Sequence, residues 1–124
     1  MNLLLDTHAL LWWLAGAPLE ARASARIADP GTLVAVSAVS MWEIAIKAAA
    51  GKLRVEGSMT EHVSAAGFEP LAVSWAHGER AGGLPGHHRD PFDRMLVAQA
   101  QLEGLTLVTR DPTFAAYEVE VLAC

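Results

Sequence analysis

Short apolar runs along the 124-residue chain alternate with longer stretches in which apolar residues recur at helical spacing. The short runs are rich in Leu, Val and Thr and are bounded by turn-forming residues, a pattern typical of buried β-strands. Strands are therefore predicted at residues 2–5, 32–36, 105–109 and 119–122, with a weaker one near 71–73.

The longer amphipathic stretches predict helices at residues 8–15, 19–28, 37–50, 58–66, 74–81 and 91–103. The last is the clearest, because Asp90 stands at the N-cap position, Pro91 at the first helical position and Gly104 just beyond the end. Residues 82–90 between the last two helices predict a loop.

The predicted helix at 37–50 has an apolar stripe and a glycine, Gly51, directly after it. The stripe consists of Val39, Trp42, Ile46 and Ala49. Strands that alternate with helices in this way predict an α/β fold with a mainly parallel sheet. No repeat, low-complexity tract or linker interrupts the chain, so we expect residues 1–124 to form a single domain.

Composition excludes a membrane-spanning protein. The longest apolar run, residues 9–15, is far shorter than the roughly 20 residues that a membrane helix needs. Three leucines followed by Asp6 predict a buried strand rather than a signal peptide. Because Cys124 is the only cysteine, no internal disulfide can form, and we expect a reducing, cytosolic environment.

Hydropathy favours a protein partner, whereas the net charge does not favour a nucleic-acid partner. The chain is 52% hydrophobic and has a mean hydropathy of +0.27, which predicts apolar surface covered by a partner or a second copy. The net charge is −5, from 9 basic and 14 acidic residues, whereas nucleic-acid-binding proteins are usually basic. Divalent cations bound among clustered acids would reverse the local field and reconcile this charge with a nucleic-acid substrate.

Four acids distant in the sequence are predicted to meet at one edge of the sheet. Asp6 and Asp111 follow strands directly, and Glu43 lies early in the helix after strand 32–36. Asp93 begins the helix that leads back into strand 105–109. The carboxyl ends of parallel strands share one edge, and ligands bind there.

Such a cluster predicts metal-dependent hydrolysis. Crowded carboxylates repel one another unless a positive charge lies between them. Mg²⁺ and Mn²⁺ prefer oxygen ligands, can activate a water molecule and can offset charge on an attacked phosphoryl group. The residues therefore favour a phosphodiester hydrolase.

Three segments combine these features in a specific order. They are LLLDTHALLWWL, VSAVSMWEIAIKAAAGKL and HHRDPFDRMLVAQAQLEGLTLVTRDPTF. Together they resemble PIN-domain ribonucleases and, more narrowly, the VapC-type toxins of bacterial toxin–antitoxin pairs. The resemblance runs nearly end to end, and only residues 56–83 lack a distinctive motif.

The resemblance implies both a fold and an activity. It places Asp6, Glu43, Asp93 and Asp111 at the acidic positions of the family, with Thr7 and Thr109 at polar positions beside them. It also implies a three-layer domain with a five-stranded sheet, Mg²⁺ or Mn²⁺ as cofactor, RNA cleavage, a homodimer and a cognate antitoxin. Because every acidic position is filled, we expect an active enzyme.

Each acid also has an ordinary structural interpretation. Ser40-x-x-Glu43 matches a capping box, although Ser37 is the better cap. Asp111 before Pro112 fits a plain turn residue, so it is the weakest of the four acids.

The two acids at the start of the helix at 91–103 compete for one role. Asp90 is the natural N-cap and only a secondary site candidate, which leaves Asp93 as the predicted ligand. Asp6 has the weakest alternative, because an acid after a buried strand, with no cap to make, is costly unless paired.

Other polar and aromatic residues carry weaker signals. His87 and His88 have no cysteine nearby and no third ligand at zinc spacing, so we expect solvated loop histidines. Arg89 and Arg94 are candidates for RNA phosphate contact, with solvated charges an equal alternative.

The start of the first predicted helix carries three further ring side chains. His8 is expected to pack at the beginning of this helix. Trp12 and Trp13 are adjacent, so one is expected in the core and the other at a partner contact.

Rival functions differ in how far the sequence disfavours them. A dehalogenase-type phosphatase needs a second Asp two residues after the first, where this chain has His8. A receiver domain needs a lysine late in the chain, whereas the only lysines, Lys47 and Lys52, are both early. A non-catalytic PIN-like binding module stays open. A metal-dependent DNA nuclease also stays open, since it would use the same chemistry.

Overall fold

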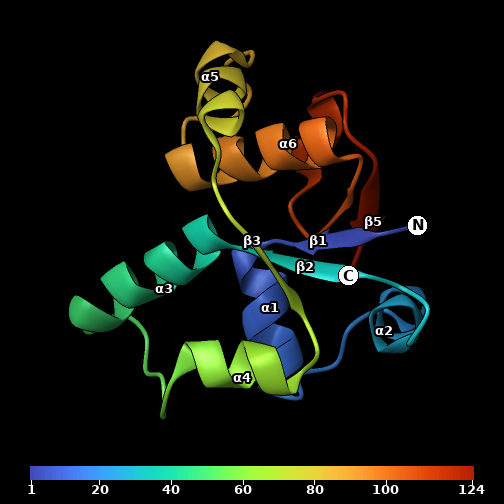
Figure 1. Ribbon diagram of the computed structural model, residues 1–124, viewed down its shortest axis with the longest axis vertical. Helices are drawn as coiled ribbons and strands as arrows, with labels where there is room; N and C mark the ends of the chain where they lie inside the picture. Colours follow the sequence, from blue (N-terminus) through green and yellow to red (C-terminus); the bar gives the residue numbers. More distant parts are fainter.

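The computed structural model describes all residues from Met1 to Cys124. Its centre is a five-stranded sheet in which every neighbouring pair is parallel, with the order β3-β2-β1-β4-β5 (Figure 1). The strands are β1 Leu3–Leu5, β2 Val34–Ser37, β3 Glu69–Leu71, β4 Thr106–Thr109 and β5 Val121–Ala123. The expected five-stranded α/β fold is confirmed, and the strand order reverses at β1, where a parallel sheet offers its ligand site.

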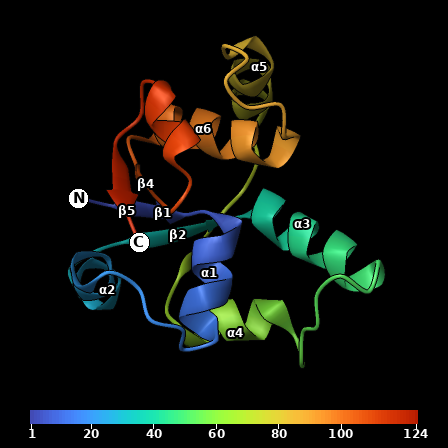
Figure 2. The ribbon, with the colours of Figure 1, turned by 180° about the vertical axis from the view of Figure 1, so that it is seen from behind.

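Helices cover both faces of this sheet. The helices are α1 Thr7–Leu14, α2 Ala21–Ala28, α3 Ala38–Ala49, α4 Met59–Ala65, α5 Trp75–Gly83, α6 Pro91–Glu103 and the short 3₁₀ helix η1 Pro112–Ala116. Figures 1 and 2 show α5 and α6 on one side of the sheet and α1, α2 and α4 on the other. The molecule is therefore built in three layers, as expected.

The central position of β1 in the sheet explains why its sequence is apolar throughout. Leu3 and Leu5 face the α1–α2 side of the sheet and Leu4 faces α6, and all three have no exposed surface. A strand covered on both faces has no polar side to present. The three leucines thus belong to two separate cores, which β1 joins.

The predicted elements are present, with shifts of at most two residues at their ends. The weak strand begins two residues earlier than 71–73 and includes Pro70, which is tolerated because β3 is an edge strand. Helix α5 continues through Gly83, into the segment predicted as loop. The helix η1 was not predicted, because it is a single 3₁₀ turn with no apolar periodicity.

The apolar stripe of α3 is not the face that this helix buries. Trp42 and Ile46 are 62% and 43% exposed, whereas the side chains buried on α3 include Glu43 and Ile44. Helix α3 projects from the end of the sheet (Figure 1), and the Phe92 ring lies 5.3 Å from the Trp42 ring on its outer side. The stripe is thus largely a surface feature.

The ring side chains of α1 differ in part from what was expected, and the partner contact of one tryptophan stays a prediction. Trp12 and Trp13 are both half-buried: Trp13 packs against Phe68, and Trp12 lies beneath the Arg110 guanidinium at 3.9 Å. His8 is exposed and stacks on Trp12.

None of the helices has the length and apolar character required to cross a bilayer.

Candidate functional site

The four predicted acids line one pocket at the carboxyl edge of the sheet. Its volume is about 120 Å³. The residues around it come from the ends of β1 and β4, from the helices α1, α3 and η1 and from the start of α6: Asp6, Thr7, His8, Glu43, Lys47, Asp90, Asp93, Asp111 and Phe114. The parallel topology therefore brings together acids that are up to 105 positions apart in the sequence.

Asp6 lies at the end of β1 and is 6% exposed. Its Oδ1 accepts a hydrogen bond of 2.7 Å from the Ala9 amide, so Asp6 is the N-cap of α1, contrary to the expectation that it has no cap to make. Burial raises its pKa, although hydrogen bonds from Thr109 and Ala9 act in the opposite direction. Asp6 thus caps a helix and also lines the pocket.

Glu43 is held by two partners on different elements. Its Oε1 accepts from the Thr7 hydroxyl at 2.7 Å and its Oε2 from Lys47 Nζ at 2.8 Å. Ser40 Oγ lies 2.9 Å from Thr7 Oγ1 and makes no capping contact with the helix start. Ser37 caps α3 through the Val39 amide, so the capping-box interpretation of Glu43 is wrong.

The two acids at the start of α6 have separate roles. Asp90 Oδ1 accepts from the Phe92 and Asp93 amides at 2.8 and 3.2 Å, which makes it the N-cap. Asp93 points into the pocket. Burial raises its pKa to about 7, and the charges of Asp90 and Glu43 add to the effect, followed by those of Asp6 and Asp111.

Asp111 caps η1 while it lines the pocket. Its Oδ1 accepts from the Thr113 amide at 2.9 Å, and its own amide donates to Thr109 Oγ1 at 3.0 Å. Burial acts to raise its pKa, but the hydrogen bonds from Thr113 and the proximity of the His88 ring outweigh burial and lower it. Asp111 is therefore both a turn residue, as its position before Pro112 suggested, and a residue of the pocket.

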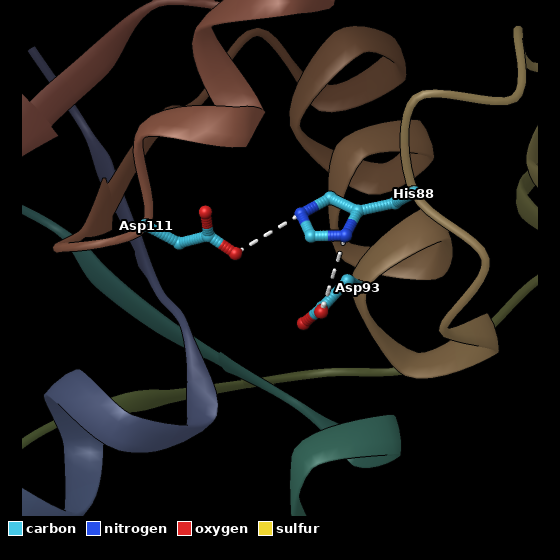
Figure 3. Close-up of side chains that lie close together, drawn as sticks. All are labelled: His88, Asp93 and Asp111. Atoms are coloured by element: carbon cyan, nitrogen blue, oxygen red, sulfur yellow. Dashed lines mark ion pairs between the residues drawn. The ribbon is translucent and has the colours of Figure 1, made fainter.

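His88 lies between two of these acids, which the sequence did not indicate. Its Nδ1 is 3.8 Å from Asp93 Oδ2, and its Nε2 is 3.2 Å from Asp111 Oδ2 (Figure 3). The side chain is 14% exposed, so the expectation of a solvated loop histidine is wrong for His88, whereas His87 is exposed. The spacing rule for metal ligands missed it because its partners come from α6 and from the end of β4.

The predicted RNA-contact residues lie outside the pocket. Arg89 is exposed. The Arg94 guanidinium donates at 2.8 Å to the carbonyl oxygens of Ala81 and Leu84 and at 2.9 Å to that of Pro85. Arg94 thus holds the segment before α6 in place. Lys47, which was not predicted, contributes a positive charge beside Glu43.

This donor set fits a hard divalent cation. Five carboxylates, the four predicted acids and Asp90, line a space of about 120 Å³, and Lys47 is the only Lys or Arg side chain that lines it. Burial raises the pKa values of Asp6 and Asp93, and the charges of neighbouring carboxylates add to the effect. A cation with oxygen ligands would supply the compensating positive charge.

Comparisons with known proteins agree with this geometry. The sequence profile of the PIN domain matches residues 3–120. Ribonuclease VapC22 of Mycobacterium tuberculosis is 29% identical over 117 residues, which cover 89% of this chain and 87% of that protein.

Solved structures share the fold over nearly the whole chain. The crystal structure of VapBC2 from Rickettsia felis, bound to a DNA fragment from their promoter, superposes with a TM-score of 0.72 at 14% identity, covering 100% of this chain and 99% of that one. A toxin–antitoxin complex from Klebsiella pneumoniae gives 0.66 at 22% identity, with coverage of 97% and 95%.

Proposed function

The chain belongs to the PIN-domain family, and on that premise we propose that it is a metal-dependent endoribonuclease, the VapC-type toxin of a toxin–antitoxin pair. The observation that carries the proposal is the convergence of Asp6, Glu43, Asp93 and Asp111 on one pocket. The similarity to a protein named as a ribonuclease supports RNA as the substrate.

Asp6, Glu43 and Asp93 are the proposed ligands of one Mg²⁺ or Mn²⁺, directly or through water. Asp111 is proposed to position the attacking water or a second ion. A bound divalent cation supplies the Lewis acidity that activates water and offsets charge on the phosphoryl oxygens.

The other polar residues of the pocket keep the carboxylates in place. Thr7 and Lys47 fix the two oxygens of Glu43, and Thr109 bonds to Asp6. Fixed ligands lose less entropy when the substrate binds and so support precise orientation. We expect water to attack phosphorus in line and to leave a 5′-phosphate and a 3′-hydroxyl. A 2′,3′-cyclic phosphate product would contradict this scheme.

The proposal extends to partners. The neighbours that share the fold include a toxin–antitoxin complex, which supports an antitoxin as the partner of this chain. A basic antitoxin side chain inserted among the acids would compete with the cation. Exposed Trp42 and Trp75 fit surfaces that a homodimer or an antitoxin covers. We propose that residues 1–124 act as one domain in the cytosol and that Arg89 contacts RNA phosphate.

Cleavage of a labelled, structured RNA by purified protein tests the function. The assay compares Mg²⁺, Mn²⁺ and EDTA, and it compares the wild type with Asp6→Asn and Asp93→Asn. We expect both variants and EDTA to reduce cleavage about 100-fold or more, because each removes part of the cation site.

A matched control separates the site from general acidity. Glu79 is exposed on α5, outside the pocket, and Glu79→Gln should cleave like the wild type. Equal cleavage by the wild type and the two site variants would identify a contaminating nuclease. Preference for single-stranded DNA would favour the DNA-nuclease alternative, and no cleavage of any RNA or DNA would favour the non-catalytic binding module.

A further inference from the structure

The segment between α5 and α6 places an imidazole ring at the edge of the pocket. The two ring nitrogens of His88 face carboxylates from different elements, Asp93 on α6 and Asp111 after β4 (Figure 3). One ligand atom from each of these three residues can be chosen so that all lie within 4.8 Å of one another. Oxygen ligands at about 2.1 Å from one small cation lie up to about 4.2 Å apart, so a small side-chain movement would bring all three onto one ion.

The position of His88 is fixed by contacts on both its main chain and its ring. The His88 amide donates to the Tyr117 hydroxyl at 2.7 Å, and its carbonyl accepts from Arg94 at 3.2 Å. The ring packs on Phe114 with a centroid distance of 4.7 Å. It also stacks on the Tyr117 ring, with an angle of 7° between the two ring planes. A solvated histidine would need none of these supports, whereas a ligand is oriented by such outer contacts.

One ring nitrogen lacks a hydrogen-bond partner. His88 Nε2 has almost no exposed surface, and although Asp111 Oδ2 is only 3.2 Å away, the pair does not meet the geometry of a hydrogen bond. A buried polar atom without a partner is destabilising, so it calls for an explanation. A cation shared with Asp111 and Asp93 would satisfy this nitrogen.

We propose that His88 is a nitrogen ligand at the Asp93–Asp111 end of the pocket and that it makes the site prefer Mn²⁺ over Mg²⁺. Mg²⁺ is bound mainly by oxygen and gives up its water reluctantly, whereas imidazole nitrogen is a better ligand for transition-metal cations. The inference rests on the proposed function, because it assumes that the pocket binds a divalent cation.

Metal binding to the full chain, without RNA, tests the inference. Dissociation constants for Mn²⁺ alone and for Mg²⁺ alone are measured by calorimetry for the wild type, His88→Asn and His87→Asn. We expect His88→Asn to weaken Mn²⁺ binding about 10- to 100-fold. Its Mg²⁺ binding should change by less than about 3-fold, because the carboxylates remain.

His87→Asn is the matched control, since His87 is the adjacent, exposed histidine and meets Tyr117 only edge-on. It should keep the wild-type preference for Mn²⁺. An unchanged Mn²⁺-to-Mg²⁺ ratio in His88→Asn would overturn the inference. An equal loss of both ions would also overturn it, since His88 would then only position the acids.

Two further readouts keep the outcomes distinct. If the wild type binds neither ion, the proposed metal-dependent function fails rather than this inference alone. If His88→Asn does not fold, the wild type is titrated with Co²⁺ and its histidine resonances are followed by NMR. A strongly shifted ring N–H signal from His88 would support direct ligation, and its absence would refute it.

Discussion

Asp93 is a partly buried carboxylate surrounded by other acidic side chains. Burial raises its pKa to about 7, and the charges of Asp90, Glu43, Asp6 and Asp111 act in the same direction. A carboxyl group in this state favours protonation or a bound cation, and the pocket exposes it to both. The same residue thus links folding stability, pH and metal binding.

The metal-free protein should therefore lose stability as pH rises. Because the pKa of Asp93 is about 7 in the folded state against an ordinary value of 3.8, its protonated form stabilises the fold fully below about pH 4. This contribution is lost as pH rises to about 7. At pH 8 in EDTA, Asp93→Asn should be more stable than the wild type by about 1–2 kcal/mol, after allowance for solvent screening.

Denaturant unfolding at pH 4 and pH 8 measures this difference. Glu79→Gln, at an exposed position on α5, should show no comparable gain at pH 8. An Asp93→Asn variant that is less stable than the wild type at pH 8 would contradict the raised pKa.

The hydroxyl of Thr7 is the second residue-scale determinant. It donates to Glu43 at 2.7 Å and lies 2.9 Å from Ser40 Oγ, in a buried position. Thr7→Val keeps the side-chain shape but leaves Glu43 with one fewer partner. We expect RNA cleavage to fall about 10- to 100-fold, as for other contacts that orient a metal ligand. Thr7→Ser retains the hydroxyl and should cleave nearly as the wild type does.

Helix α6 shows how one element both positions and perturbs a site residue. Its start is fixed by Asp90 at the N-cap and Pro91 in the first turn, and it ends at Gly104, whose φ of 66° is easily adopted by glycine. These are local sequence signals, and they place Asp93 at the third helical position. The approach of Asp93 to Asp6 and Asp111, in contrast, depends on the packing of this helix against α3, α5 and β4.

Substitution of Asp90 separates capping from charge. Asp90→Ala removes the hydrogen bonds to the Phe92 and Asp93 amides and should cost about 1 kcal/mol of unfolding free energy. Asp90→Asn keeps a capping oxygen and removes the charge that helps to raise the pKa of Asp93. We expect Asp90→Asn to be as stable as the wild type and its Asp93 pKa, followed by carboxyl NMR, to be lower. An unchanged pKa would show that the Asp90 charge has no effect.

At the scale of the whole molecule, the sheet gathers the site from distant segments. Asp6, Glu43 and Asp93 reach one pocket because β1 and β2 are parallel neighbours and α6 returns to β4 on the other side of β1. A cation held by these acids would connect both halves of the sheet. Its binding energy would then add to the stability of the fold.

Metal removal should accordingly lower the unfolding temperature. Saturating Mg²⁺ at 100 times its dissociation constant contributes about 2.7 kcal/mol, which for a chain of this size corresponds to several degrees or more. The rise in unfolding temperature on adding Mg²⁺ should be larger at pH 8 than at pH 5, because protons compete for Asp93. Differential scanning fluorimetry of the wild type and Asp6→Asn measures it. An equal rise in Asp6→Asn would place the cation elsewhere.

Local sequence signals suffice to predict which segments form strands and helices and which strands are followed by acidic side chains. The apolar run before Asp6, the cap signals around Asp90 and the strand before Asp111 are local, and local sterics and burial suffice to predict strands and helices from them. The sequence also predicted the four acids of the pocket, since parallel strands share an edge.

Which surfaces meet, in contrast, follows from the packing of the elements against one another. The outward face of α3, the two half-buried tryptophans of α1 and the placement of His88 between Asp93 and Asp111 all depend on how elements pack. The physical reason is that periodicity reports the neighbours of a residue along its own element. A side chain whose partners lie on other elements leaves no such trace in the sequence.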